Sequence, residues 1–583
     1  MRQLPSRVIL AACVLGAAAQ ACTGTIDEPS GAGGNGPGAP ATGASSNAGA
    51  GFNAAGAPVQ PTTNPSAIDL LTHPPAEPVA ANITCTDQSV VPQGRIARLS
   101  AEGYRNSLKD TLGLANVDAS TAPLDAVSEK SRFATNSVQN VVTQPWAEWL
   151  YDQGENAAIQ LASALPAQHA CMTAAGARLD CVHAFIQDYA TKLFRRPVTT
   201  DEVTRYQTAY TQWVATLSPL DATTALLQAW TMSPNHVFRT ELGNHGIGTP
   251  IAGEVELTQY ELASEISFMF ANTAPDALLL ADAQQNKLSD PAVVKGHAQR
   301  LLATAGGHQV LKNFFYEFLH LRELDGGALD PAQRPLVPSM QAETATFVEN
   351  VVFTQGGGLD KLFSNTASTV DAPLATFYGV TAGTSVDTQR PGLLHQAAFL
   401  NARRDSTRRG LFVRGELLCS PPAQPPPDAV AVAMTLVFDE SDTAREIFRV
   451  INDSGPVCSA CHASFVPFGL SFEHYDKLGQ FREQQNGQML DVTGTFPDLG
   501  DLSGAFVDSA DMLQKILASN QGQLCFAKRF VSYLAGRDAH GVLDGCLISK
   551  AHTQMVNNQF SLQSFMLELT QDASFYRRIN LTN

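Results

Sequence analysis

The sequence predicts a mainly α protein with several helical domains, and two observations support this prediction. Apolar residues recur at intervals of three and four over most of the chain, which is the spacing of one helix face. The alternation of apolar and polar residues that is typical of half-buried strands is scarce. Hydrophobic residues make up 44% of the 583 residues and charged residues 16%, so the chain can bury several cores.

The N-terminus has the layout of an export signal. Arg2 and Arg7 precede an apolar run, residues 8–19, that is too short to span a bilayer. Residues 19–21, Ala-Gln-Ala, form a small-residue cleavage site, and Cys22 follows directly. We therefore predict a signal peptide that ends near this point, of the lipoprotein type, with Cys22 carrying the lipid. Plain secretion is the alternative.

An exported protein of this kind is expected in the cell envelope, in the periplasm or at the outer-membrane surface, with the lipid anchor as its only membrane contact. Residues 23–84 are predicted to be a disordered tether, because up to about residue 66 they are almost entirely Gly, Ala, Ser, Asn and Pro. The net charge of −17 argues against a nucleic-acid partner, because phosphates require a basic surface.

Residues 98–114 show how the helices are recognised. Ser100 is a good N-cap and Gly113 is a C-cap candidate. Every fourth residue from Tyr104 to Leu112 is apolar, which marks a buried stripe. Comparable signals predict further helices at 146–161, 181–196, 221–232, 260–270, 291–302, 309–321 and 523–534.

The most specific chemical signal is the pentapeptide Cys458-Ser-Ala-Cys461-His462. C-x-x-C-H is the attachment signal of a c-type haem, in which two thiols bond to the haem and the imidazole binds the iron. The composition predicts roughly 0.004 chance matches in a chain of this length. Pro467 fits as well, because a backbone carbonyl in its loop can accept the other imidazole N–H. The alternatives are a CxxC disulfide, a redox dithiol or half of a zinc site.

The sixth iron ligand is less clearly indicated. Met489 is a candidate 27 residues after His462, and a thioether there would raise the reduction potential. Met512, His474 and His540 are rivals. A methionine in a helix is more often part of the core than a ligand.

Two groups of arginines allow either a structural or a binding role. Arg195 and Arg196 lie in the last turn of the predicted helix 181–196, where positive charge is favourable, but they would also suit an anion. The basic segment 403–409 would suit haem propionates, or it forms a solvated loop.

The remaining cysteines suggest three disulfides. Six cysteines are left after the signal region and the pentapeptide are set aside, and an exported chain meets an oxidising compartment. Proximity in the sequence suggests two pairs, and elimination suggests the third. The expected pairs are Cys171–Cys181, Cys525–Cys546 and Cys85–Cys419.

Several of these segments together resemble the planctomycete cytochrome-C-like family of multi-domain exported proteins, along nearly the whole mature chain. The resemblance is carried by residues 98–114, 181–203, 257–282, 408–427, 458–482 and 525–537. The chain departs from the family pattern at Glu265, where Arg is usual, and at 405–407, where Asp-Ser-Thr replaces a Ser-Pro pair. The resemblance implies the architecture, an exported location and a haem, but no particular reaction.

The predicted organisation places a small c-type-cytochrome-like domain near the C-terminus, after several helical domains. The expected segments are a signal peptide (1–22), the tether (23–84), an N-terminal helical domain (85–165), a helical domain with the arginine pair (166–245), a large helical domain (246–385), the cytochrome-c-like domain (386–505) and a C-terminal helical domain (506–583).

Three functions follow as hypotheses. The first is an exported, lipid-anchored protein with covalent haem c that transfers electrons to a partner that the sequence does not identify. The second is a haem-dependent oxidoreductase on an extracellular substrate, because about 300 helical residues before the pentapeptide exceed what electron transfer requires. No second cofactor motif is present and no catalytic residue is indicated. The third is a surface binding or structural protein without haem, in which the cysteines form a disulfide or metal clip.

Overall fold

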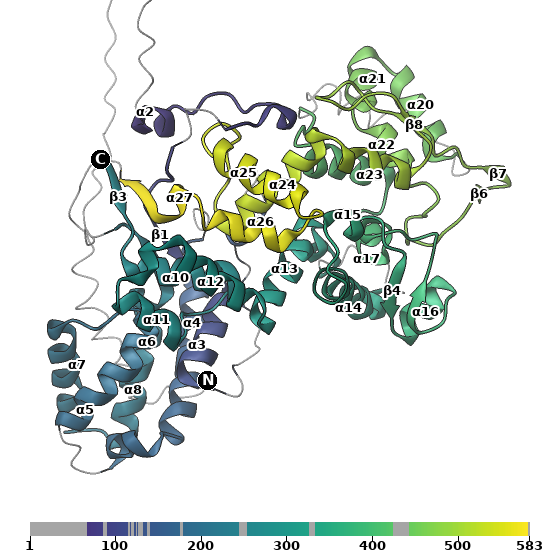
Figure 1. Cartoon of the computed structure of the whole chain (residues 1–583). Helices are drawn as coiled ribbons and strands as arrows, with labels where there is room; N and C mark the ends of the chain where they lie inside the picture. Colours follow the sequence, from purple (N-terminus) through teal and green to yellow (C-terminus); the bar gives the residue numbers. More distant parts are fainter. Residues whose placement is uncertain are drawn as a thin grey trace, which may run out of the picture. The chain divides into compact units, whose positions relative to one another are not determined.

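The computed structural model describes residues 67–580, apart from gaps within 86–89, 115–139, 175–178, 244–252, 326–332 and 424–441. Over these residues the fold is mainly α, as predicted (Figure 1). The predicted signal peptide, Cys22 and the first part of the tether lie outside the described residues. No helix in the described part of the chain combines the length and apolar character that crossing a bilayer requires.

The first hydrophobic core gathers residues between 99 and 237. Its first helix forms as predicted, because the Ser100 hydroxyl accepts from the Gly103 N–H and Gly113 ends the helix in the left-handed conformation, with φ of 65°. Short 3-10 and π segments carry the label η. The helices of this core are α3 (Ala101–Leu112), α4 (Gln144–Ser163), η2 (Ala167–Thr173), α5 (Leu179–Phe185), η3 (Ile186–Ala190), α6 (Thr191–Phe194), α7 (Thr200–Trp213), α8 (Pro219–Thr231) and α9 (Pro234–Val237).

The second core is larger and gathers residues between 80 and 575. The elements of its first part are α10 (Gln259–Ala271), α11 (Ala277–Gln284), η4 (Lys287–Ser289), α12 (Pro291–Leu302), α13 (Ala305–Phe318), η5 (Leu321–Asp325), η6 (Arg334–Leu336), α14 (Val337–Val348), η7 (Glu349–Thr354), α15 (Leu359–Leu362), α16 (Ala372–Tyr378), η8 (Leu393–His395), α17 (Ala397–Ala402), α18 (Ser406–Phe412) and η9 (Val413–Leu417).

The C-terminal helices pack into this same second core. Phe314 of α13 lies against Phe530 and Tyr533, with ring centroids 4.6 and 5.2 Å apart. The helices are α23 (Ser509–Ala518), α24 (Asn520–Ala535), α25 (Gly545–Asn557), α26 (Leu562–Leu569) and α27 (Ala573–Tyr576), and the N-terminal α2 (Ala67–Thr72) and η1 (Ala80–Asn82) precede the first core in sequence. Segments that the sequence suggests as separate large and C-terminal domains therefore share their apolar interior.

The strands are short and form antiparallel pairs. One pair joins the last strand of the described chain to a strand in its middle part, with Arg577 opposite Glu256. The pairs are β1 (Arg95–Arg98) with β2 (Phe238–Glu241), β3 (Gly253–Glu256) with β10 (Arg577–Asn580), β4 (Ala367–Val370) with β5 (Gly383–Val386), β6 (Gln484–Gln485) with β7 (Gln488–Met489), and β8 (Gly494–Thr495) with β9 (Ala505–Phe506).

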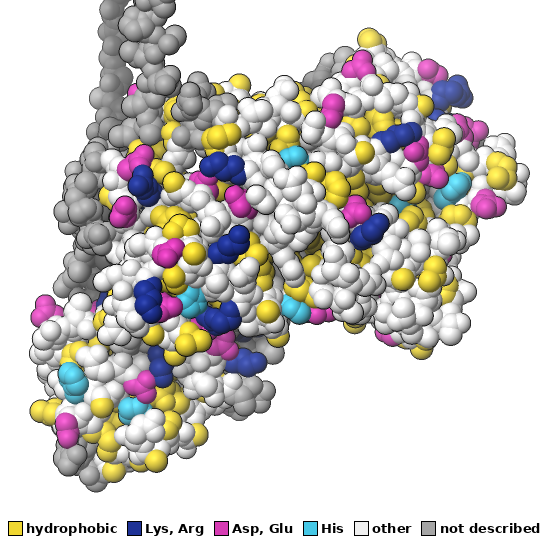
Figure 2. Space-filling model, viewed as in Figure 1, with side chains coloured by type: hydrophobic (Ala, Val, Ile, Leu, Met, Phe, Trp, Pro, Cys, Tyr) yellow, Lys and Arg dark blue, Asp and Glu magenta, His cyan; other side chains and the backbone are white. Residues whose placement is uncertain are grey.

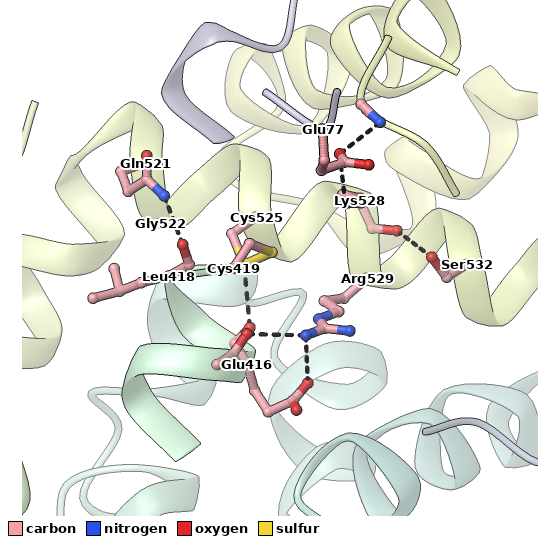
Figure 3. Close-up of a disulfide and its surroundings, with 12 residues drawn as sticks. Glu77, Glu416, Leu418, Cys419, Gln521, Gly522, Cys525, Lys528, Arg529 and Ser532 are labelled. Carbon is pink, nitrogen blue, oxygen red and sulfur yellow. Dashed lines mark hydrogen bonds and ion pairs between the residues drawn. A yellow bond between two sulfur atoms is a disulfide. The ribbon is translucent and has the colours of Figure 1, made fainter. Parts of the chain in front are cut away.

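All six candidate cysteines are in disulfides, but two of the three expected pairs are wrong. Cys171–Cys181 forms as expected, and the other bridges are Cys85–Cys546 and Cys419–Cys525. Cys525 lies on α24 and faces the end of η9, where Cys419 follows (Figure 3).

The Cys85–Cys546 bridge has its explanation in the path of the N-terminal segment. Residues 67–85 run along the C-terminal helices: Glu77 forms an ion pair with Lys528 at 2.6 Å, and the Ala81 N–H donates to Gln521 Oε1 (Figure 3 labels Glu77, Lys528 and Gln521). This course brings Cys85 to the start of α25. Sequence proximity is a poor guide here because the chain ends return to each other.

Candidate functional site

The pentapeptide lies on α21 (Pro456–Ala463), which follows α20 (Ala444–Asp453) after a short turn at Gly455. Pro456 opens α21, as expected for the first position of a helix. Cys458 and Cys461 are three residues apart and therefore lie near one face of the helix. Each thiol is partly exposed and free of any disulfide.

Around this helix lies a third, small apolar core. It consists of Phe448, Phe465, Val466 and Leu470, with Cys461 packed at its edge. Phe465 and the residues after it lead into α22 (Val466–Leu470). The core is separate from the two larger ones, so it has few apolar neighbours of its own.

Helix α20 carries an apolar stripe that is only partly covered. Ala444, Ile447, Phe448 and Ile451 have the i, i+3, i+4, i+7 spacing of one helix face. Phe448 is the only one of the four that is buried. This stripe is a part of the site that we did not predict, although its spacing is readable in the sequence.

His462 sits between the rings of Phe448 and Phe465, with centroids 5.7 and 5.5 Å away. Its Nδ1 atom is buried and has no hydrogen-bond partner in the described part of the chain. Burial lowers the pKa of His462, which favours the neutral imidazole that binds metals. A neutral imidazole next to two free thiols and an incompletely covered apolar stripe fits the donor set and surroundings of a c-type haem.

Pro467 does not accept from this imidazole. It lies in the first turn of α22, and its carbonyl accepts from the Ser471 N–H at 3.3 Å. Nδ1 of His462 has no partner in the described part of the chain, so the hydrogen bond that we expected from a carbonyl of this loop is absent there.

The candidates for a sixth ligand occupy different surroundings. Met489 lies on β7 with 66% of its surface exposed, and its sulfur accepts from the Gln484 amide at 3.2 Å. Met512 is fully buried, and its sulfur accepts from the Ser471 hydroxyl at 3.6 Å. His540 pairs with the Pro75 carbonyl through Nε2, at 3.0 Å.

Most of the predicted arginine groups serve the fold. Arg195 is 3% exposed, has a left-handed φ of 58°, and donates to the carbonyls of Leu193, Asn235, His236 and Phe238. Arg409 is 1% exposed and donates to five backbone carbonyls, including those of Tyr475 and Asp476. Such arginines hold segments together and cannot reach a ligand.

The free cysteines and His462 do not belong to a larger cluster of metal-binding side chains within the described ranges. No group of three or more His, Cys, Asp or Glu side chains is gathered there in an arrangement that could hold a metal ion. The face shown in Figure 2 carries basic and acidic side chains in small interspersed groups.

Three family models match the chain, in sequence order. They are PSD5, a protein of unknown function (DUF1595), at residues 181–241; PSD4, a protein of unknown function (DUF1592), at 257–380; and PSCyt3, a protein of unknown function (DUF1588), at 390–485. The last match includes the pentapeptide. No curated protein and no solved structure matches the chain.

Proposed function

We propose, from the premise that the chain belongs to the planctomycete cytochrome-C-like family, that it is an exported c-type haem protein with an electron-transfer role. The observation that carries the proposal is the state of the pentapeptide. Its two thiols are unbridged, and the imidazole next to them is partly buried, which lowers the pKa of His462 and favours the neutral, metal-binding form. These are the groups that covalent haem requires.

In this proposal each residue has a defined task. Cys458 and Cys461 would form the thioether bonds, and the imidazole of His462 would bind the iron. Haem supplies one-electron redox chemistry when it is bound. Phe448 and Phe465 pack against the imidazole and shield it from water, and burial lowers the pKa of His462, which favours the neutral form.

The anchoring of the protein is part of the same proposal. Cys22 would carry lipid after cleavage of the signal peptide and would hold the protein at the envelope. The residues that decide this lie outside the described part of the chain, so the sequence is the support. We expect the wild-type protein to be recovered in the membrane fraction and the Cys22→Ala variant to be lost from it. Cys13→Ala is the matched control and should stay in the membrane fraction.

The direct test is the visible spectrum of the mature chain, made in a host that attaches c-type haem, after denaturation in pyridine. We expect a c-type haemochrome at one haem per chain. Cys458→Ser with Cys461→Ser should abolish covalent haem, because the thioether bonds cannot form. Ser459→Ala, between the two cysteines, is the control and should retain haem. A folded, colourless wild-type protein would contradict the proposal and favour a surface binding protein.

A further inference from the structure

A second site lies beside η5 and η9, outside the pentapeptide. It is a cavity of about 500 Å³, a volume typical of pockets that take small organic molecules. Three arginines and two glutamates line it, together with His320 and two apolar residues of α18, Leu411 and Phe412. The lining is therefore charged and convergent, with an apolar wall on one side.

The charged groups form a connected array. The Arg403 guanidinium donates to His320 Nδ1 and to the Glu323 carboxylate. His320 Nε2 lies 3.6 Å from Glu416 Oε1, and the other oxygen of Glu416 lies 3.2 Å from Arg529 on α24 (Figure 3 shows Arg529 beside Glu416). These residues come from segments up to about 200 positions apart, and the Cys419–Cys525 bridge ties η9 to α24 next to them.

His320 is held in one protonation state. A guanidinium only donates, so Nδ1 must accept and the single ring proton lies on Nε2, toward Glu416. Burial, with Arg403 as the nearest cation, lowers the pKa of His320 well below its usual value. Both ring nitrogens are thus committed, which makes the imidazole a fixed part of the wall and not a general base.

The backbone at His320 gives an independent sign of specialisation. Its φ is 56°, in the left-handed region, although it is not glycine. A bulky residue in this region costs free energy and persists only where the surroundings over-determine it; such residues cluster at functional sites. Here the conformation turns the imidazole from the end of α13 toward Arg403 and Glu416.

Two arginines at this cavity, Arg132 and Arg408, are exposed and can reach a ligand. Arg403 is compensated by Glu323, and Glu416 by Arg529. Arg408 is about half exposed and lies 3.6 Å from Asp405, with which it forms an ion pair. Arg132 is exposed, and its charge, with those of Arg529 and Arg403, opposes the rise that burial causes in the pKa of Glu416. In a chain of net charge −17, a pocket with one net positive charge is a local exception.

We propose that this cavity binds a small organic carboxylate, with the carboxylate on Arg132 and Arg408 and the apolar body against Leu411 and Phe412. Arginine presents paired N–H donors that match a carboxylate. The net charge of the lining suits a monoanion, and the apolar wall favours an organic body over an inorganic ion. The inference is independent of the haem proposal, since no residue of the pentapeptide lines the cavity.

The test is calorimetric titration of the full mature chain with benzoate, benzamide and inorganic phosphate, on protein with and without haem. We expect one benzoate per chain, with benzamide at least about tenfold weaker because the neutral amide removes the charge. Arg408→Gln and Arg132→Gln should each weaken benzoate about tenfold. Both positions are exposed, so the fold should be unaffected. Arg205→Gln, on the exposed face of α7, is the control and should bind benzoate as the wild type does.

Each contrary outcome overturns the inference. If the folded wild-type protein binds no benzoate, the cavity is not a carboxylate site. Equal affinity for benzamide and benzoate would show that the site does not recognise the negative charge of the carboxylate. Phosphate that binds as tightly as benzoate would make the cavity an inorganic-anion site. Benzoate binding that survives in the Arg132→Gln, Arg408→Gln double variant would place the ligand elsewhere.

Discussion

At the scale of single residues, burial decides what a charged side chain does in this protein. Glu241 is 2% exposed and receives Arg95 at 2.8 Å and Arg578 at 2.7 Å. Glu265, where the family pattern usually has arginine, pairs with Arg239 at 3.0 Å. Glu265 is thus a second buried carboxylate within a cluster of arginines. Buried charges of one sign require partners of the other sign nearby.

Buried Glu343 gives a prediction about pH. Burial raises the pKa of Glu343 to about 7, against the hydrogen bonds that Tyr378 and Ser368 donate to it. The folded protein then keeps this proton up to about pH 7, whereas the unfolded chain releases it near the ordinary value of 4.5. The stabilising contribution of the protonated carboxyl is full below pH 4.5 and is lost as pH rises through 7.

The stability of Glu343→Gln relative to the wild type should therefore increase as pH rises. The amide mimics the protonated carboxyl, so we expect the difference in unfolding free energy to shift by about 1–3 kcal/mol in favour of the variant between pH 5 and pH 8. Urea unfolding at several pH values measures it. Glu483→Gln, at an exposed position, is the control. A pH-independent difference would show that Glu343 is ionised throughout.

His462→Ala tests the proximal ligand. The thioether bonds do not involve the imidazole, so covalent haem should remain in the pyridine spectrum, while the native spectrum and the reduction potential change. His183→Ala, an exposed histidine of α5, should leave both unchanged. A native spectrum identical to that of the wild type would assign the proximal position to another residue.

At the scale of elements, the contact of α18 with α22 supports the pentapeptide. A Cβ atom on Gly469 would lie 1.7 Å from the Ser406 carbonyl oxygen, and one on Gly410 would lie 2.3 Å from the Phe465 carbonyl oxygen. The two helices therefore meet backbone to backbone. Phe465, which packs on His462, is part of this contact.

Gly469→Ala should separate α18 from α22. We expect a loss of about 2 kcal/mol or more in unfolding free energy, because the new Cβ atom meets backbone atoms of Ser406, which cannot rotate away. Protease sensitivity of residues 444–470 should rise with it. Gly296→Ala, inside α12 with open space around the new methyl group, is the matched control and should gain about 0.5–1 kcal/mol. Equal behaviour of the two variants would contradict the close approach.

At the scale of the whole molecule, long-range links close the chain on itself. The Cys85–Cys546 bridge joins residues 461 positions apart, and β3 pairs with β10 across most of the folded chain. Cys171–Cys181 closes a separation of only 10. Because closing a long loop costs the unfolded chain more entropy, the long-range bridge should stabilise the folded protein more than the short one.

Removal of the long-range bridge should destabilise the protein more than removal of the short one. In the chain-entropy account the difference is about 3 kcal/mol. We expect Cys85→Ser with Cys546→Ser to lower the thermal midpoint clearly more than Cys171→Ser with Cys181→Ser, measured by calorimetry at one scan rate. An equal or smaller loss for the long-range pair would mean that the chain ends are held by other contacts, such as Glu77–Lys528.

The sequence by itself determined what depends on near neighbours in the chain. The caps of α3, the helical stripe from Tyr104 to Leu112 and the spacing of Cys458, Cys461 and His462 all involve residues a few positions apart. Helix period and backbone capping act over that range, so the pattern predicts them. The mainly α fold and the resemblance to the family follow from such local patterns.

The tertiary structure alone decided the long-range partners. Cys525 was expected to join Cys546 and joins Cys419, and Arg409 turns inward to backbone carbonyls. The array of His320 and Glu416 has no local signature, since its members lie nearly 100 positions apart and meet only because α13 and η9 share one core. Which distant groups meet depends on the path of the whole chain, and a local pattern carries no information about that path.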